Sequence, residues 1–183
     1  MLAQGKPMEE TMADINVALA ACDQATKDLI VAAESSGPAW STPRAPGKWS
    51  PSQIVEHVAR SLEESANVAA GRPSKFPNFP AILRPVLRAV LFRRVLKNEA
   101  FPKGRTNKAM NPESGPATPA DGRTRLETAQ RKFDDAFRQL VSRGGSVRST
   151  IFGTVAAEDY VRFMEIHTRH HRKQLEGRRV MTS

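Results

Sequence analysis

Four histidines are the residues of this sequence whose type and spacing suggest chemistry. His167 and His171 are four residues apart, so in an α-helix they lie on one face, one turn from each other. That face also carries apolar side chains, namely Tyr160, Phe163, Met164 and Leu175. Two imidazoles at this spacing that face a core can bind the same metal ion. His57, from another predicted core helix, would complete a set of three nitrogens for one divalent transition metal.

Three protein ligands leave at least one coordination position for water or substrate, which is typical of a reactive site rather than a structural one. Without such a partner, burying three polar rings would cost ~1–3 kcal/mol for each unsatisfied group. Two alternatives remain open. A pair of histidines at this spacing is common on exposed helix faces, and a single buried histidine is more often held by hydrogen bonds than by a metal.

Three further residues are candidates for positions around the three histidines. His170 falls roughly 80° from the centre of the apolar face, which predicts a place at the rim of a pocket. Gln174 shares the face of the histidines and could orient one of them, although simple packing explains it as well. Glu64 follows His57 by about two helical turns and could hydrogen-bond a bound water, or it could be an ordinary solvated acid. Trp49 is expected to be a core residue or to form a hydrophobic staple with Ile54 at the start of its helix.

The elements that must position these side chains are helices. Apolar residues recur at helical spacing over residues 9–34, 51–70, 124–143 and 156–177. At the start of the second helix, Ser50 and Gln53 form a capping-box pattern around Pro51, and Thr124 and Glu127 form one at the third. No segment alternates for long enough to indicate a strand. The sequence therefore predicts an all-α fold, a four-helix bundle, within a single domain over residues 1–183.

Residues 71–120 form a long, irregular, proline-rich crossover between the second and third helices. Within it, AILRPVLRAVLFRRVLKN has apolar and basic residues at helical spacing and predicts a short basic amphipathic helix. Its cations Arg84, Arg88, Arg94 and Lys97 could project on the side opposite its apolar residues and bind an anionic partner. Those apolar residues are Leu83, Leu87, Val90 and Leu91. The stretch from Lys103 to Asp121 has almost nothing to bury and is expected to be loop.

The composition restricts the class of protein. Apolar residues make up 39% and charged residues 26%, as in globular proteins, and the formal net charge is +9. The N-terminus lacks the apolar stretch of a signal peptide, and no apolar run approaches the ~20 residues needed to span a bilayer. A single cysteine, Cys22, excludes an intrachain disulfide. We therefore expect a cytoplasmic protein without a transmembrane segment.

Two stretches of the chain, PGKWSPSQIVEHVARS and IHTRHHRKQL, together resemble the motifs of the DinB-like superfamily of metalloenzymes, which includes the YfiT-like proteins. In that superfamily a W-S-x-x-(E/Q)-x-x-x-H motif opens the second helix and H-x-x-H-H-x-x-Q-(L/I) closes the fourth. The residues that match these motifs are Trp49, Ser50, His57, His167, His170, His171, Gln174 and Leu175. The resemblance implies that His57, His167 and His171 are the ligands, that the metal is nickel or zinc, and that the chain forms a homodimer. The basic crossover is not part of the shared pattern.

Two kinds of function are compatible with these observations. The first is a metal-dependent hydrolase, or a transferase that uses a low-molecular-weight thiol, acting on a small molecule. Relatives in the superfamily include thiol-dependent enzymes, so the resemblance favours the thiol. The second is a binding protein whose basic segment, residues 72–105, binds nucleic acid or lipid. No nucleic-acid-binding motif or row of stacking aromatics is present, which makes nucleic acid the less favoured partner.

Overall fold

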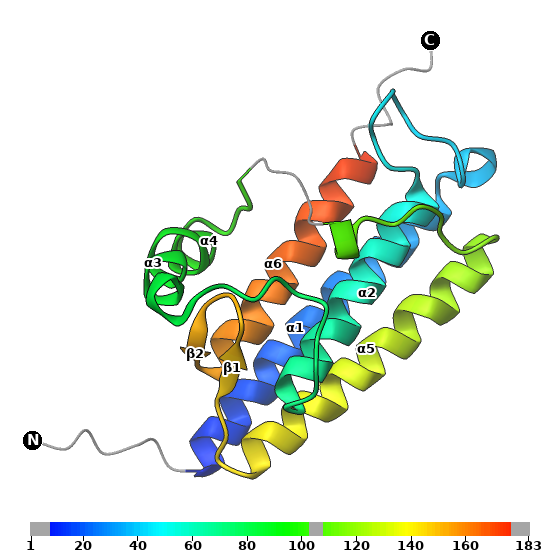
Figure 1. Cartoon of the computed structure of the whole chain (residues 1–183). Coiled ribbons are helices and arrows are strands. Elements are labelled where there is room, and N and C mark those ends of the chain that lie inside the picture. Colours follow the sequence, from blue (N-terminus) through cyan, green and yellow to red (C-terminus); the bar gives the residue numbers. More distant parts are fainter. Residues whose placement is uncertain (1–7, 103–107, 177–183) are drawn as a thin grey trace, which may run out of the picture.

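Four long helices form the body of the molecule in the computed structural model, which describes residues 8–102 and 108–176. They are α1 (Met8–Glu34), α2 (Pro51–Ala69), α5 (Pro119–Ser142) and α6 (Ala157–Glu176) (Figure 1). α1 packs against α6 and α5, and α2 packs against α5, whereas α2 and α6 approach each other much less closely. The predicted four-helix bundle is confirmed, and its least tightly packed side lies between α2 and α6.

The core is built from the apolar faces of these helices. In α5, Leu126, Phe133 and Phe137 are fully buried at helical spacing, and in α1 Ile15 and Leu19 are buried in the same way. Each helix carries polar side chains on its other face. Within the described residues, no helix combines the length and the apolar character that crossing a membrane requires.

The N-terminus of α2 has the local structure that its sequence predicts. The Ser50 hydroxyl accepts a hydrogen bond from the Gln53 backbone N–H, and the Gln53 side chain accepts one from the Ser50 N–H. Pro51 occupies the first helical position, where its missing N–H costs nothing. This capping box fixes where α2 begins and therefore fixes the position of His57 in its second turn.

The predicted start of the third long helix is wrong. α5 begins at Pro119, and its capping box joins Thr118 to Asp121, not Thr124 to Glu127. Gly122 lies within α5, and the ring of Trp40 occupies the space that a side chain at this position would need. An ideal Cβ on Gly122 would lie 2.5 Å from Cη2 of Trp40.

The crossover between α2 and α5 contains several short helical pieces, as predicted for its basic part. They are a 3-10 turn (Ala81–Leu83), α3 (Arg84–Leu87), a π-helical turn (Arg88–Phe92), α4 (Arg93–Asn98) and a second 3-10 turn (Lys108–Met110). The expectation that residues 103–121 bury almost nothing is wrong at Met110, which is 3% exposed. Residues 103–107 of that stretch lie outside the described residues.

A two-stranded antiparallel hairpin precedes α6 and was not predicted. β1 (Val147–Ser149) pairs with β2 (Gly153–Val155). Each strand has only three residues, too few to show an alternating pattern. The turn depends on the Ser149 hydroxyl, which accepts hydrogen bonds from the backbone N–H groups of Ile151 and Phe152. The hairpin lies beside α3 and the N-terminal half of α6 (Figure 1).

Candidate metal centre

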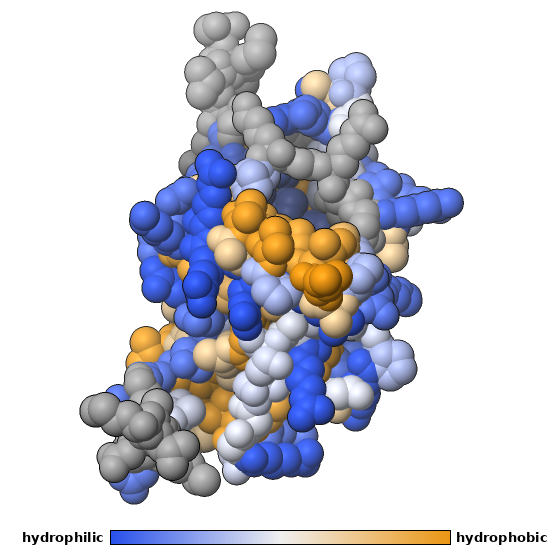
Figure 2. All heavy atoms as spheres, turned by 60° about the vertical axis from the view of Figure 1, so that its left-hand side comes forward, coloured by the Kyte–Doolittle hydropathy of each residue, from blue (hydrophilic) through white to orange (hydrophobic). Residues whose placement is uncertain are grey.

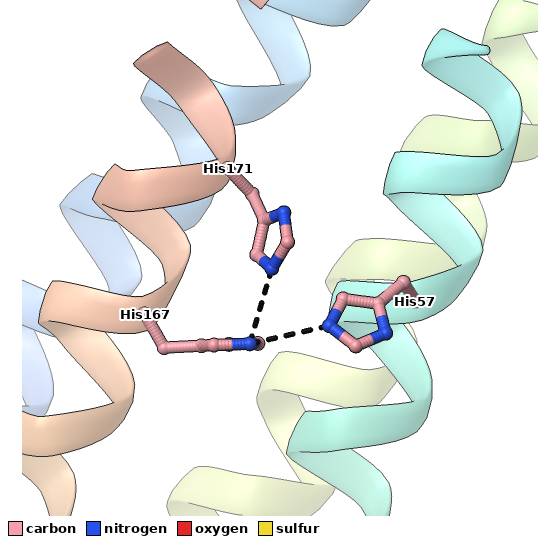
Figure 3. A group of neighbouring side chains, drawn as sticks. All are labelled: His57, His167 and His171. Carbon is pink, nitrogen blue, oxygen red and sulfur yellow. Dashed lines mark hydrogen bonds between the residues drawn. The ribbon is translucent and has the colours of Figure 1, made fainter. Parts of the chain in front are cut away.

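The three predicted ligand histidines come together between α2 and α6. The Nε2 atom of His167 lies 3.2 Å from Nε2 of His57 and 3.2 Å from Nε2 of His171. In Figure 3 the three rings point toward one another, two from α6 and one from α2. Metal–nitrogen bonds of about 2.0–2.1 Å place neighbouring ligand atoms about 2.9 Å apart at right angles and about 3.3 Å apart at tetrahedral angles. The observed nitrogen separations fall within this range.

A hydrogen bond to the crossover fixes the orientation of His57. Its Nδ1 lies 2.7 Å from the backbone carbonyl oxygen of Met110. Because a carbonyl can only accept, Nδ1 must carry the proton, and Nε2 of the neutral ring presents a lone pair to the other histidines. Met110 was not expected here, because any residue type supplies a backbone carbonyl and the sequence therefore gives no signal for it.

Gln174 orients the ring of His171. Its amide oxygen lies 3.1 Å from Nδ1 of His171, and its amide nitrogen lies 3.1 Å from Nε2 of His170. The proton of His171 is therefore on Nδ1, which leaves a lone pair on Nε2 as in His57. His170 does not join the group of three. It is half-buried and lines a surface cleft of about 290 Å³ together with Ile166 and Lys173.

The hydrogen-bond arrangement around these rings is the feature that best fits a bound cation. His57 and His171 both direct a lone pair toward Nε2 of His167. A proton on Nε2 of His167 could form a good hydrogen bond to only one of these two rings. Without that proton, the lone pairs of all three Nε2 atoms would face one another. Nδ1 of His167 is buried and has no hydrogen-bond partner within the described residues. A cation among the three Nε2 atoms would bind all three of these lone pairs, so the residues present fit a metal ion.

Burial keeps these rings uncharged. Desolvation lowers the pKa of His57 below its usual value and lowers the pKa of His167 and His171 well below it. The neighbouring imidazoles add to the effect on His167 and His171, because a positive charge on one ring would repel a positive charge on the next. At neutral pH the rings therefore have free lone pairs, the form in which imidazole binds metals.

Two aromatic rings that the sequence did not assign to the site lie against the histidines. The ring of Trp49 lies 4.6 Å from His57 and 5.9 Å from His171, centroid to centroid, so Trp49 is a neighbour of the site and only half-buried. Phe101, from the crossover, lies 5.3 Å from His167. Such apolar neighbours lower the local dielectric and limit the positions that the imidazole rings can adopt. The position of Trp49 directly before the cap of α2 was the available signal.

Glu64 lies elsewhere and is not a solvated acid. It is buried, and its carboxylate accepts a hydrogen bond from the backbone N–H of Lys75 at 2.8 Å and one from the Asn67 amide at 3.5 Å. These bonds attach α2 to the beginning of the crossover. The only group of potential ligands that converges in the described part of the chain is His57, His167 and His171.

The basic segment also differs from its prediction. Arg84 donates from Nε to the carbonyl of Phe79, and Arg88 donates from a terminal nitrogen to the carbonyl of Thr154, each at 2.8 Å. Both side chains are half-buried, so they face the molecule. Arg94 and Lys97 are exposed as expected.

Comparison with known families agrees with this arrangement. A family model described as the DinB superfamily matches residues 18–175, a range that includes all three converging histidines. No curated protein and no solved structure matches the chain. Because the match covers most of the sequence, the chain belongs to the DinB superfamily.

Proposed function

We propose that the chain binds one divalent transition metal ion through the Nε2 atoms of His57, His167 and His171. The observation that carries this proposal is the convergence of three neutral imidazoles, two of which are locked by hydrogen bonds in the tautomer that presents a lone pair inward. Imidazole ligands suit zinc and nickel, the two metals that the family resemblance implies.

We further propose that the site is catalytic and acts on a small molecule. A cation with three neutral ligands keeps its full charge and, when bound, lowers the pKa of a water or thiol at its open position. The residues of the chain hold the ligand geometry. Met110 and Gln174 fix two rings, and Trp49 and Phe101 exclude water from their faces.

Of the two reactions, transfer of a low-molecular-weight thiol to an electrophilic substrate is the one we favour. Hydrolysis commonly uses a carboxylate that accepts a proton from the attacking water. Glu64, which was considered as a hydrogen-bond partner of a bound water, instead accepts hydrogen bonds from the Lys75 backbone N–H and the Asn67 amide. A thiol, with a usual pKa near 8.5, becomes a strong nucleophile once its pKa is lowered and needs less help from a base. Metal-dependent hydrolysis remains the second candidate.

Turnover assays with the metal-loaded protein separate the two reactions. Bacillithiol, mycothiol and glutathione would each be tested as a co-substrate with 1-chloro-2,4-dinitrobenzene, and p-nitrophenyl acetate without thiol would report hydrolysis. We expect thiol-dependent turnover that His171→Ala abolishes and that His170→Ala retains. Ester hydrolysis without thiol dependence would support the second candidate, and equal rates for the wild type and His171→Ala would contradict a catalytic role for the site.

A further inference from the structure

Four aliphatic side chains of the crossover point into solvent on one surface. They are Ile82, Leu83, Val86 and Val90, and they are 46–83% exposed. We call these four residues the apolar patch. Figure 2 shows an apolar surface near the middle of the face in view, with hydrophilic side chains on both sides of it. Side chains of this size gathered at one place usually mark an interaction site rather than chance exposure.

Contacts on the opposite side of the segment keep the apolar patch facing solvent. Arg84 and Arg88, which alternate with the patch residues in the sequence, are bound to the backbone of residues 79 and 154. Phe92, 2% exposed, anchors the segment in the core, with its ring 5.0 Å from that of Phe152 and 5.1 Å from that of Phe163. The segment therefore presents its apolar side to solvent because its other side is attached to the hairpin and to α6.

Exposed cations accompany the apolar patch. Arg93, Arg94 and Lys97 follow it directly, and residues 81–98 contain no acid. The next acid, Glu99, pairs with Arg162 at 2.7 Å. Aliphatic side chains combined with unopposed cations on a short helical segment are typical of helices that lie in the headgroup region of anionic membranes.

We propose that residues 81–98 dock reversibly on an anionic lipid surface, with the apolar patch inserted among the headgroups. The combination of charges and apolar residues favours lipid over the other possible partners. A second copy of the chain, related by two-fold symmetry through the apolar patch, would bring another segment 81–98 that contains no acid to pair with Arg93, Arg94 and Lys97. Nucleic acid would neutralise the cations but would leave the aliphatic side chains in water. A homodimer formed through another face is compatible with this proposal.

Vesicle co-sedimentation of the full-length protein tests the apolar part of the proposal. We expect the wild type to bind vesicles of phosphatidylcholine with 30% phosphatidylglycerol, but not vesicles of phosphatidylcholine alone, and to be released as salt rises from 50 to 500 mM. The double variant Val86→Ser/Val90→Ser should bind about tenfold more weakly, because each valine contributes apolar burial. The matched control is Val17→Ser/Val31→Ser, which changes two valines of α1 with similar exposure, 62–72%, and should bind like the wild type.

A second pair of variants tests the charges. Arg93→Gln/Arg94→Gln/Lys97→Gln should bind more than tenfold more weakly, since each cation near an anionic surface contributes about fivefold. The control Lys48→Gln/Arg131→Gln/Arg143→Gln removes the same charge from exposed positions elsewhere and should have a much smaller effect.

Four outcomes would overturn the proposal. The first is no vesicle binding by the wild type at 50 mM salt, and the second is an equal loss of binding in a test variant and in its control. The third is unchanged binding by Val86→Ser/Val90→Ser. The fourth is a protein that binds a DNA duplex but not vesicles, with Val86→Ser/Val90→Ser still binding the DNA. Sedimentation velocity in the absence of lipid tests the alternative that a second copy covers the apolar patch. A dimer that Val86→Ser/Val90→Ser dissociates would support the second copy as the occupant in place of lipid.

Discussion

The two outer imidazoles of the cluster are oriented by acceptors of different kinds. The acceptor for His57 is a backbone carbonyl, whereas the acceptor for His171 is the side chain of Gln174. Only the second can be removed by a single substitution without moving the backbone. Gln174 therefore offers the cleanest test of whether the hydrogen bonds around the rings support metal binding.

We predict that Gln174→Leu lowers metal affinity by about 10–100-fold, because His171 loses the acceptor that fixes its tautomer and ring orientation. Competition with a chromophoric chelator would measure the dissociation constant. Gln139→Leu, at an exposed position of α5, is the control and should leave affinity unchanged. An affinity within twofold of the wild type in Gln174→Leu would show that the hydrogen bond has no such role.

The lowered pKa values of the three histidines predict how the stability of the metal-free protein depends on pH. In the unfolded chain each ring takes up a proton as the pH falls through about 6.5, whereas in the folded chain burial keeps it neutral to lower pH. The free energy of unfolding is therefore highest above pH 6.5. Below that pH it falls, by up to about 1.4 kcal/mol per pH unit for each ring.

Urea denaturation with a chelator present, at pH 7.5, 6.5 and 5.5, would measure this dependence in the wild type and in His167→Asn. We expect the shallower decline in the variant. Burial also raises the pKa of Asp134 to about 6, so its protonation stabilises the fold as the pH falls. That contribution is common to both proteins and cancels in the comparison. Parallel curves for the two proteins would contradict the assignment.

At the residue scale, sequence alone could predict the side chains that share the face of one helix. His167, His171 and Gln174 lie together because helix geometry fixes their directions. Glu64 shows where this reasoning fails, because its carboxylate is bound by a backbone N–H of the following loop, and helical periodicity contains no information about that loop. Met110 acts through its backbone, so its side chain gave no indication of its role.

At the scale of elements, the crossover supports the cluster of three histidines. Several hydrogen bonds attach residues 110–116 to α2 and to the residues that precede it. The Gln53 amide donates to the carbonyls of Pro112 and Glu113, and the Trp40 indole donates to that of Pro116. The same stretch supplies the carbonyl that orients His57. Displacing the crossover from α2 should therefore affect the site.

Gly115→Ala is the variant that tests this connection. An ideal Cβ on residue 115 would lie 2.0 Å from the backbone oxygen of Ser52, and the atoms of α2 cannot easily move. We expect the free energy of unfolding to fall by about 1–3 kcal/mol, as for overpacked sites, together with weaker metal binding. Ser114→Ala, at the exposed neighbouring position, serves as control. Denaturant melts would measure the loss of stability, and chelator competition would measure the loss of metal affinity. Unchanged metal affinity in Gly115→Ala would show that the attachment of the crossover to α2 does not affect the site.

Element starts were predictable where capping chemistry and apolar pattern agree, as at Ser50 and Gln53 of α2. At α5 the prediction used Thr124 and Glu127, whereas the capping box joins Thr118 to Asp121. Gly122, in the part of the helix that was missed, lies against Trp40, a contact distant in sequence. The hairpin and the orientation of residues 81–98 depend in the same way on tertiary contacts, which local periodicity does not encode.

At the scale of the whole molecule, the three histidines connect α2 and α6, across the least tightly packed side of the bundle. Unfolding separates them, so the unfolded chain cannot offer the same three ligands. Metal binding should therefore stabilise the fold. The expected gain in the free energy of unfolding is about 2.7 kcal/mol when free metal exceeds its dissociation constant a hundredfold.

Thermal or urea melts with and without zinc would measure this gain. His171→Ala should show little of it, because one of the three ligands is gone, whereas His170→Ala should keep it. A similar stabilisation in His171→Ala and in the wild type would place the metal at another site.

The most direct test of the central claim is the metal content of the protein, determined by inductively coupled plasma mass spectrometry after purification without a nickel resin. We predict about one zinc or nickel ion per chain in the wild type and in His170→Ala, and much less than one in His171→Ala. A wild type that holds no ion even after incubation with zinc or nickel, or a His171→Ala variant that still holds one per chain, would contradict the account.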